Sequence, residues 1–430
     1  MAAGTREDKR DMNRLLSGLA ALAMAGLASG AAMADVTVKW LHIENTPETV
    51  SWMQGVAKAY EAAHPGVTIQ MQYLENEAYK AKMPTTLQSP DRPNIIYSWG
   101  GGVLRDQVKA GVIEDLSGPM KGEWADRFSP AALDAFTVDG HVWGVPVLAS
   151  QVGFWFNKPL FAKAGVKAED IKTWTDLLAA VKTIKAAGIV PIAAGGADKW
   201  PIHFYWTHLA IRLGGKAAFQ SAYNQSGDGF DGPVFVKAGE HLKELAALEP
   251  FEPGYLGLTN PQSSGYFGDG NAAMNLMGNW DYNASKANSA SGKGIADADL
   301  GWFPFPVVDG GTGEPTDVLG GVNGWLVTKG SPPEAADFLK FLTSQENQAK
   351  AAELGLYIPV VKGTAEKLKN PFFRQMAENI GKAGYFQVFY DQMLGANVGR
   401  VVNDVSTDLA SGATDPADAA SQVQDAWAMH

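Results

Sequence analysis

A regular alternation of expected strands and helices near the start of the chain constrains its fold most strongly. Three segments with strand-like patterns are separated by two segments with helical spacing, in the order 35–42, 47–64, 67–73, 77–87 and 95–98. A βαβαβ order is typical of a parallel sheet covered by helices, so the sequence predicts an α/β fold. In such sheets, ligands bind at the carboxyl ends of the strands.

The length of 430 residues exceeds what one hydrophobic core usually supports, so two lobes are expected. Three proline-marked extended segments, at 145–146, 300–306 and 357–360, are expected to cross between the lobes. We therefore assign 35–145 and 303–355 to one lobe, and 146–302 and 356–430 to the other. The ligand cleft is expected between them.

Loops that combine glycine with tryptophan occur at three places in the chain. They are Trp99 with Gly100, Trp280 shortly after Gly278 with Asp281 beside it, and Trp325 shortly after Gly320 and Gly321. Glycine lets backbone N–H groups approach a ligand closely, and an indole offers a flat face to a ring. The loops predict a cleft for a polar, ring-shaped ligand, although each tryptophan has an alternative role in a core. Glu44 and Asn45 follow the first expected strand and belong to the same edge.

The N-terminal segment resembles an export signal. Arg14 precedes an uncharged run that ends in Ala32-Met33-Ala34, and this order is typical of a signal peptide at 1–34 cleaved after Ala34. A membrane anchor is the alternative. The net charge of −11 disfavours nucleic acid and anionic membranes as partners. With no cysteine for a lipid anchor, a periplasmic protein is expected.

Motifs for enzymatic chemistry are not found in the sequence. There is no G-x-S-x-G, H-E-x-x-H or phosphate-binding loop, and the seven histidines are not at zinc-ligand spacing. No catalytic residue, metal or cofactor is therefore predicted. A carboxylate pair drawn from Glu44, Asp281 and Asp391 leaves a periplasmic glycosidase or lyase as an alternative.

An ordered set of short segments carries a family resemblance over the mature chain. They include Gly153-Phe154-Trp155-Phe156-Asn157, Thr173-Trp174-Thr175-Asp176-Leu177, Phe267-Gly268-Asp269-Gly270 and Gly278-Asn279-Trp280. In these the chain resembles the family-1 extracellular solute-binding proteins of carbohydrate ABC transporters, the type that includes maltose-binding protein. The resemblance implies a type II two-lobed fold that closes on a sugar and delivers it to an inner-membrane ABC permease.

The resemblance also implies roles for particular residues. Asp391 and Gln392, in the segment Phe389-Tyr390-Asp391-Gln392, would bond sugar hydroxyls. Trp280 would stack on the ligand with help from Asp281, and Gly320 and Gly321 would offer backbone groups. Glu44 and Asn45 lie where family members often place a polar sugar contact.

The ligand expected from this resemblance is a small oligosaccharide or glycoside, and the protein is expected to act as a monomer. A binding protein for a non-sugar solute, such as a polyol, a polyamine or a peptide, is the nearest alternative. A phosphorylated ligand would need clustered basic residues, and none stand beside Trp99, Trp280 or Trp325.

Overall fold

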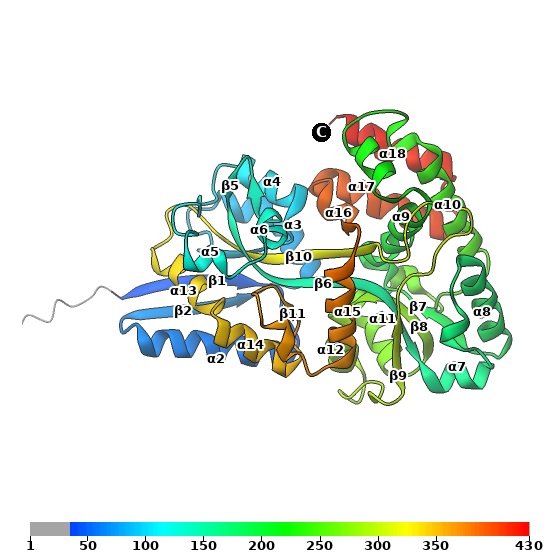
Figure 1. Cartoon of the computed structure of the whole chain (residues 1–430), viewed down its shortest axis with the longest axis horizontal. Helices are drawn as coiled ribbons and strands as arrows, with labels where there is room; N and C mark the ends of the chain where they lie inside the picture. Colours follow the sequence, from blue (N-terminus) through cyan, green and yellow to red (C-terminus); the bar gives the residue numbers. More distant parts are fainter. Residues whose placement is uncertain (1–34, 430) are drawn as a thin grey trace, which may run out of the picture.

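A computed structural model of the protein describes residues 35–429. The predicted signal peptide at 1–34 lies outside the described residues. Figure 1 shows two lobes side by side, joined by the long strands β6 (Gly144–Asn157) and β10 (Val318–Val327). Within the described residues, none of the helices has the length and apolar character needed to span a membrane.

The first lobe contains the βαβαβ unit predicted from the sequence. Strand β1 pairs in parallel with β2 from Val36 opposite Val67, and with β3 from Trp40 opposite Ile95. The elements up to the first crossing are β1 (Val36–His42), α2 (Pro47–Ala63), β2 (Val67–Tyr73), α3 (Asn76–Gln88), β3 (Ile95–Ser98), α4 (Gly101–Lys109), α5 (Glu123–Asp126), α6 (Pro130–Asp134), β4 (Thr137–Val138) and β5 (His141–Val142).

Local sequence signals explain why these elements begin and end where they do. Helix α2 starts with a proline at its first position and buries Met53, Val56 and Tyr60 on one face. In the second lobe, Thr173 accepts a hydrogen bond from the Asp176 N–H and forms a capping box at the start of helix α8 (Trp174–Ala186).

The second lobe is built from pieces on both sides of β10. Before β10 come α7 (Lys158–Ala164), α8 (Trp174–Ala186), β7 (Val190–Ala193), α9 (Trp200–Tyr223), α10 (Pro233–Ala246), α11 (Asn260–Gly268), β8 (Ala272–Gly278), α12 (Asp281–Asn288) and β9 (Leu300–Phe303). After it come α15 (Pro371–Lys382), β12 (Phe386–Val388), α16 (Tyr390–Met393), α17 (Ala396–Ser411) and α18 (Pro416–Ala428).

The chain returns to the first lobe through β10, which pairs antiparallel with both β3 and β6. The first lobe is then completed by α13 (Glu334–Leu342), α14 (Gln345–Leu354) and β11 (Ile358–Pro359). The principal sheet has the strand order β2-β1-β3-β10-β6-β8-β7, so it runs continuously through both lobes. The two-lobed α/β fold is the architecture that the sequence predicted, whereas the sheet that both lobes share is seen only in the structure.

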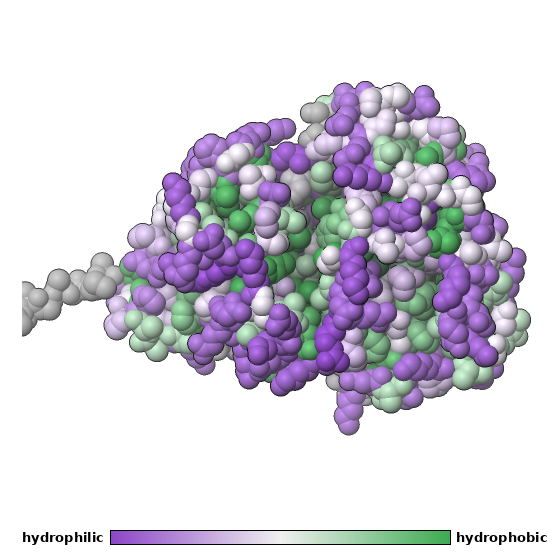
Figure 2. Space-filling model, viewed as in Figure 1, coloured by the Kyte–Doolittle hydropathy of each residue, from purple (hydrophilic) through white to green (hydrophobic). Residues whose placement is uncertain are grey.

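Two separate hydrophobic cores define the lobes. The first contains Trp40, Tyr97 and Trp325, and the second contains Trp155 and Trp206. Hydrophobic residues are visible between the lobes in Figure 2, whereas hydrophilic residues cover much of the outer surface.

The segment 300–306, expected to cross between lobes, instead belongs wholly to the second core. Strand β9 pairs antiparallel with the second-lobe end of β6, from Phe154 opposite Phe303. Phe305 then stacks on Trp174 with ring centroids 5.6 Å apart. The crossing is made by β10, whose glycines make its pattern hard to recognise as a buried strand.

Candidate functional site

A cleft lined by residues from both lobes is the main candidate site. Its cavity volume is about 200 Å³. Aromatic side chains from both lobes line it, namely Tyr97, Trp99, Trp200, Phe204, Trp280, Tyr357 and Phe389. The cleft also has polar walls, formed by Glu44, Asn45, Thr46, Glu75, Asn76, Lys80, Asp198, Asn260, Asn279, Asn288, Asn323, Asp391 and Gln392.

Glu44 and Asn45 lie in the cleft because β1 ends at His42 and the chain turns toward α2. Glu44 is partly buried, and its removal from water raises the pKa of its carboxyl group to about 7. The Asn45 side chain lies near the hydroxyl of Tyr73, at the end of the neighbouring strand. The strand-end position predicted for both residues is therefore observed.

Trp99 lines the cleft directly after β3. Its ring lies edge-on to Tyr97, with centroids 5.1 Å apart, and to Tyr79 at 5.7 Å. Gly100 does not line the cleft. It has a φ of +69°, and a Cβ there would lie 2.7 Å from the Ala135 carbonyl oxygen, so a side chain at this turn would be strained.

Trp280 lines the cleft from the second lobe, just before α12. Its ring lies close over Gly278, where an added Cβ would be 2.1 Å from the indole. The ring is also 6.1 Å from Phe389 and 6.3 Å from Trp200. Glycine at 278 thus makes room for the position of Trp280 in the cleft.

Asp281 is adjacent to Trp280 in sequence but does not line the cleft. It is 1% exposed, and its carboxylate accepts hydrogen bonds from the hydroxyl of Ser264 and from Asn275 Nδ2 at 2.9 Å. Burial raises the pKa of this carboxyl group to about 6. The structure gives this residue internal partners that connect α11, β8 and α12.

Asp391 and Gln392 line the cleft at the start of α16, together with Phe389. Asn403 Nδ2 lies 3.3 Å from one Asp391 oxygen, and His203 Nε2 lies 3.6 Å from the other. His203 is fully buried, its Nδ1 donates to the Trp200 carbonyl oxygen, and loss of hydration lowers its pKa. Asn403 therefore orients Asp391 from behind, whereas His203 Nε2 has no hydrogen-bond partner among the described residues.

The remaining predicted residues lie on β10, outside this cleft. A Cβ on Gly320 would lie 1.9 Å from the Ser150 carbonyl oxygen, and one on Gly321 would lie 2.8 Å from the ring of Phe389. These glycines allow close packing where β10 crosses between lobes. Trp325 is 4% exposed and lines a smaller cavity behind the main cleft.

Several lining residues were not singled out from the sequence. The sequence did not point to Asn76, Tyr97, Asn323 or Tyr357 as site residues, yet all four line the cleft. Strand-end position could have indicated Tyr97, which lies on β3 two residues before Trp99. Asn323 reaches the cleft only because β10 runs antiparallel to β3.

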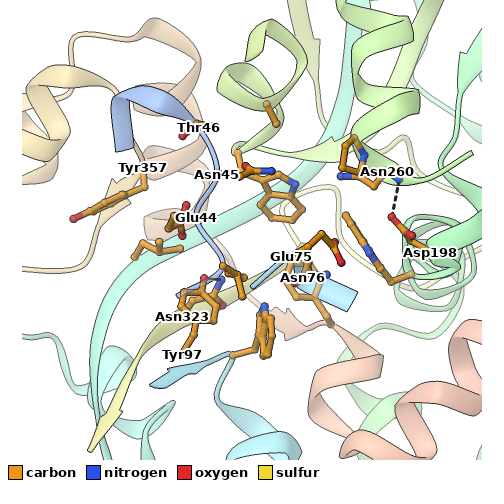
Figure 3. A pocket seen from close by; sticks show the side chains of 18 of the residues that line it. Glu44, Asn45, Thr46, Glu75, Asn76, Tyr97, Asp198, Asn260, Asn323 and Tyr357 are labelled. Atoms are coloured by element: carbon orange, nitrogen blue, oxygen red, sulfur yellow. Dashed lines mark hydrogen bonds between the residues drawn. The ribbon is translucent and has the colours of Figure 1, made fainter. Parts of the chain in front are cut away.

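Acidic groups outnumber basic ones around the cleft. Figure 3 shows Glu44, Tyr97, Asn323 and Tyr357 on one side, and Asp198 on the other, where it accepts a hydrogen bond from the Asn260 N–H at 2.7 Å. Lys80 is the one basic residue among the described lining residues, and its Nζ lies 3.0 Å from Glu77. No group of metal-ligating side chains is found in the part of the chain that the structure describes.

Comparison with solved structures gives close matches over nearly the whole described chain. A structure from work on xylan utilization by Caldanaerobius polysaccharolyticus has a TM-score of 0.84 at 26% identity and covers 91% of this chain and 99% of its own. A chitin oligosaccharide binding protein has a TM-score of 0.81 at 25% identity, with coverage of 92% and 98%.

Curated relatives match over shorter stretches. An uncharacterized ABC transporter extracellular-binding protein of Pyrococcus horikoshii is 31% identical over 185 residues, which is 42% of each chain. A probable sugar-binding periplasmic protein of Mesorhizobium japonicum is 28% identical over 226 residues, 52% of each chain. The chain thus spans about half the length of these relatives or less.

The family model for bacterial extracellular solute-binding proteins matches residues 44–349. This stretch runs from Glu44, which lines the cleft, to helix α14, and it includes both crossing strands. On this match, the chain belongs to the family of bacterial extracellular solute-binding proteins.

Proposed function

We propose that this protein is the ligand-binding component of a carbohydrate ABC importer, and that a small oligosaccharide or glycoside binds between the lobes. The observation that carries the proposal is the lining of the cleft, where indoles from both lobes stand among neutral amides. Trp99 comes from the first lobe, and Trp200 and Trp280 come from the second. The names of the sugar-binding relatives support the same ligand class.

Aromatic faces and amides suit the two surfaces of a sugar. The C–H face of a pyranose ring is apolar and packs on an indole, whereas its hydroxyls need donors and acceptors at its edge. Asn76, Asn279, Asn288 and Gln392 each offer both a donor and an acceptor. A neutral ligand would therefore be held by stacking and hydrogen bonds.

Binding between lobes gives the protein a signal for its partner. A ligand that contacts both lobes favours the closed arrangement to the extent of its higher affinity for that arrangement. We propose that an inner-membrane permease recognises the closed form. In this proposal the protein is a periplasmic monomer, exported by a signal peptide at 1–34 and cleaved after Ala34.

A binding role predicts no turnover of the ligand, with no catalytic residue, metal or cofactor required. Aryl glycosides incubated with the purified protein should release no phenol above the uncatalysed rate. Steady release that scales with protein concentration would instead support the glycosidase alternative.

The central test is thermal unfolding of the purified protein with a panel of mono-, di- and trisaccharides, polyols, polyamines and peptides. A ligand at about 100 times its dissociation constant should add about 2.7 kcal/mol of stability. Trp280→Ala should abolish the shift caused by a saccharide. Trp143→Ala is the control, since Trp143 lies outside the cleft and bonds the Val138 carbonyl oxygen. A shift from non-sugar ligands alone would contradict the proposal.

A further inference from the structure

A second, smaller cavity opens behind Glu44. Its volume is about 20 Å³, and it shares Glu44, Tyr97, Asn323 and Tyr357 with the main cleft. We call it the inner cavity. A volume of about 10–15 Å³ is enough for one water-sized group, so this space suits one small polar group of a ligand in the cleft.

Aromatic rings form much of the wall of the inner cavity. Trp40, Trp52 and Trp325 line it in addition to Tyr97 and Tyr357. These rings pack against one another. The Trp325 ring lies edge-on to the rings of Trp40 and Tyr97, with 5.1 Å between ring centroids in each pair. The Trp52 ring lies edge-on to that of Tyr357, with centroids 5.8 Å apart. A cation that lies over the face of such a ring, within about 6 Å of its centroid, is attracted to it.

The carboxylate of Glu44 has no positive partner to neutralise it. No ion pair involves Glu44 among the described residues, and the only basic residue lining the main cleft, Lys80, is paired with Glu77. The other charged groups that line the cleft are Glu75, Asp198 and Asp391, all acidic. The ligand-free cleft therefore has an excess of negative charge.

The polar atoms around the inner cavity include an unpaired acceptor. Asn323 is 7% exposed, its Nδ2 donates to the Tyr97 hydroxyl at 2.8 Å, and its Oδ1 has no partner. The Tyr357 hydroxyl accepts from Gln348 Nε2 at 3.1 Å and keeps one lone pair free. A sugar hydroxyl donates one hydrogen bond, whereas an ammonium group donates three and accepts none.

We propose that the ligand carries a protonated amine, which binds to Glu44 at the inner cavity with Asn323 Oδ1 as a second acceptor. This inference rests on the proposed function, and it narrows the ligand class to amino sugars, or glycosides of amino sugars, with an unsubstituted amine. An N-acetyl group is neutral and larger, so it satisfies neither the charge nor the size of the inner cavity.

The test compares ligands that differ only in the substituent at C2 of each sugar ring. Isothermal titration calorimetry of the purified protein would use trios of free amine, N-acetyl and hydroxyl forms: glucosamine, N-acetylglucosamine and glucose, the galactose equivalents, and their β-1,4-linked disaccharides. In at least one trio the amine form should bind about tenfold more tightly than both counterparts, a difference of about 1.4 kcal/mol. Glu44→Gln should remove this preference.

Glu48→Gln is the matched control. Glu48 is an exposed carboxylate in the first turn of α2, four residues from Glu44 and outside both cavities. The Glu48→Gln substitution removes one negative charge, as Glu44→Gln does, and this variant should keep the preference for the amine form of the ligand. Because the trios are compared on the unmodified protein first, the result does not depend on how well the Glu44→Gln variant folds.

Three outcomes would overturn the inference, and they separate it from the proposed function. If neutral saccharides bind and the amine forms bind no more tightly, the proposed function stands and the amine site is wrong. If the amine preference survives in Glu44→Gln, the amine binds elsewhere. If putrescine or spermidine binds and no saccharide does, both the amino-sugar inference and the proposed function fail.

Discussion

At the scale of single residues, the cleft depends on glycines as much as on the side chains they accompany. Trp280 occupies the space above Gly278 that any larger residue would fill. The adjacent Asp281 shows that neighbours in sequence can have different roles, because its carboxylate is buried and bonded to Ser264 and Asn275. Position in the chain does not by itself determine which side chain faces a ligand.

Gly278→Ala should therefore weaken saccharide binding. The added methyl group would displace the Trp280 ring, so we expect about a tenfold loss of affinity or more, with a destabilisation of about 1–3 kcal/mol. Calorimetric titration and urea unfolding measure the two effects. Gly55→Ala in α2, where a Cβ meets nothing within 4 Å, should instead stabilise by about 0.5–1 kcal/mol. Unchanged affinity in Gly278→Ala would refute the role of this glycine.

Asp281 should make stability depend on pH. Its pKa of about 6 lies above its ordinary value of 3.8, so the folded state binds this proton more tightly than the unfolded state. The resulting stabilisation is complete below pH 3.8 and is lost as pH rises through about 6, on the order of 3 kcal/mol.

The difference in unfolding free energy between the protein and Asp281→Asn isolates this contribution. We expect that difference to change between pH 4 and pH 6.5 and to stay constant from pH 7 to pH 8. A difference that does not change with pH would show that Asp281 has an ordinary pKa. These measurements are made without ligand, so that titration of the carboxylates that line the cleft does not change the unfolding free energy through ligand binding.

At the scale of elements, a side chain of helix α3 in the first lobe lies near indole rings of both lobes. Lys80 extends from α3, and its Nζ lies 5.6 Å from the ring centroid of Trp99 in the first lobe and 5.8 Å from that of Trp200 in the second. A cation between two indoles holds the lobes together without any ligand. A sugar ring that stacks on either indole would compete with it.

Lys80→Met should shift the ligand-free protein toward a more open arrangement. Each cation–π contact contributes about 0.5–1 kcal/mol at an exposed site, enough to change the ratio of open to closed forms several-fold. Small-angle X-ray scattering should show a larger radius of gyration. Lys82→Met, on the exposed side of the same helix, should leave the radius unchanged. Equal radii for both variants would show that Lys80 does not hold the lobes together.

At the scale of the whole molecule, two cores share one sheet, and the cleft lies between them. Residues 43–46 belong to the first lobe, and Asn279, Trp280 and Ala284 belong to the second, yet both groups line the cleft. A ligand that bridges the lobes must therefore restrict both segments at once.

Hydrogen–deuterium exchange with a saturating saccharide should show slower exchange in 43–46 and in 279–284 together. Segments away from the cleft, β2 and α10, serve as internal references and should exchange as before. Protection confined to one lobe would indicate binding without closure and would contradict the proposed mechanism.

The sequence by itself determined the fold class and the strand-end part of the site. Alternation in β1 and β2 predicts strands because successive side chains face opposite sides of a sheet. Parallel pairing then places the residues that follow β1 and β3, including Glu44 and Trp99, at one edge. The match of Phe389, Asp391 and Gln392 to a family segment located the other wall of the cleft.

Only the tertiary structure decided which strand crosses between the lobes and which side chains meet behind Glu44. The run at 300–306 has prolines typical of a crossing, but pairing with β6 holds it in the second lobe. Asn323 and Trp325 come within reach of Tyr97 because β10 lies beside β3, more than 200 residues away in the chain. Local patterns fix the direction of side chains within an element, whereas contacts between distant strands depend on how whole elements pack.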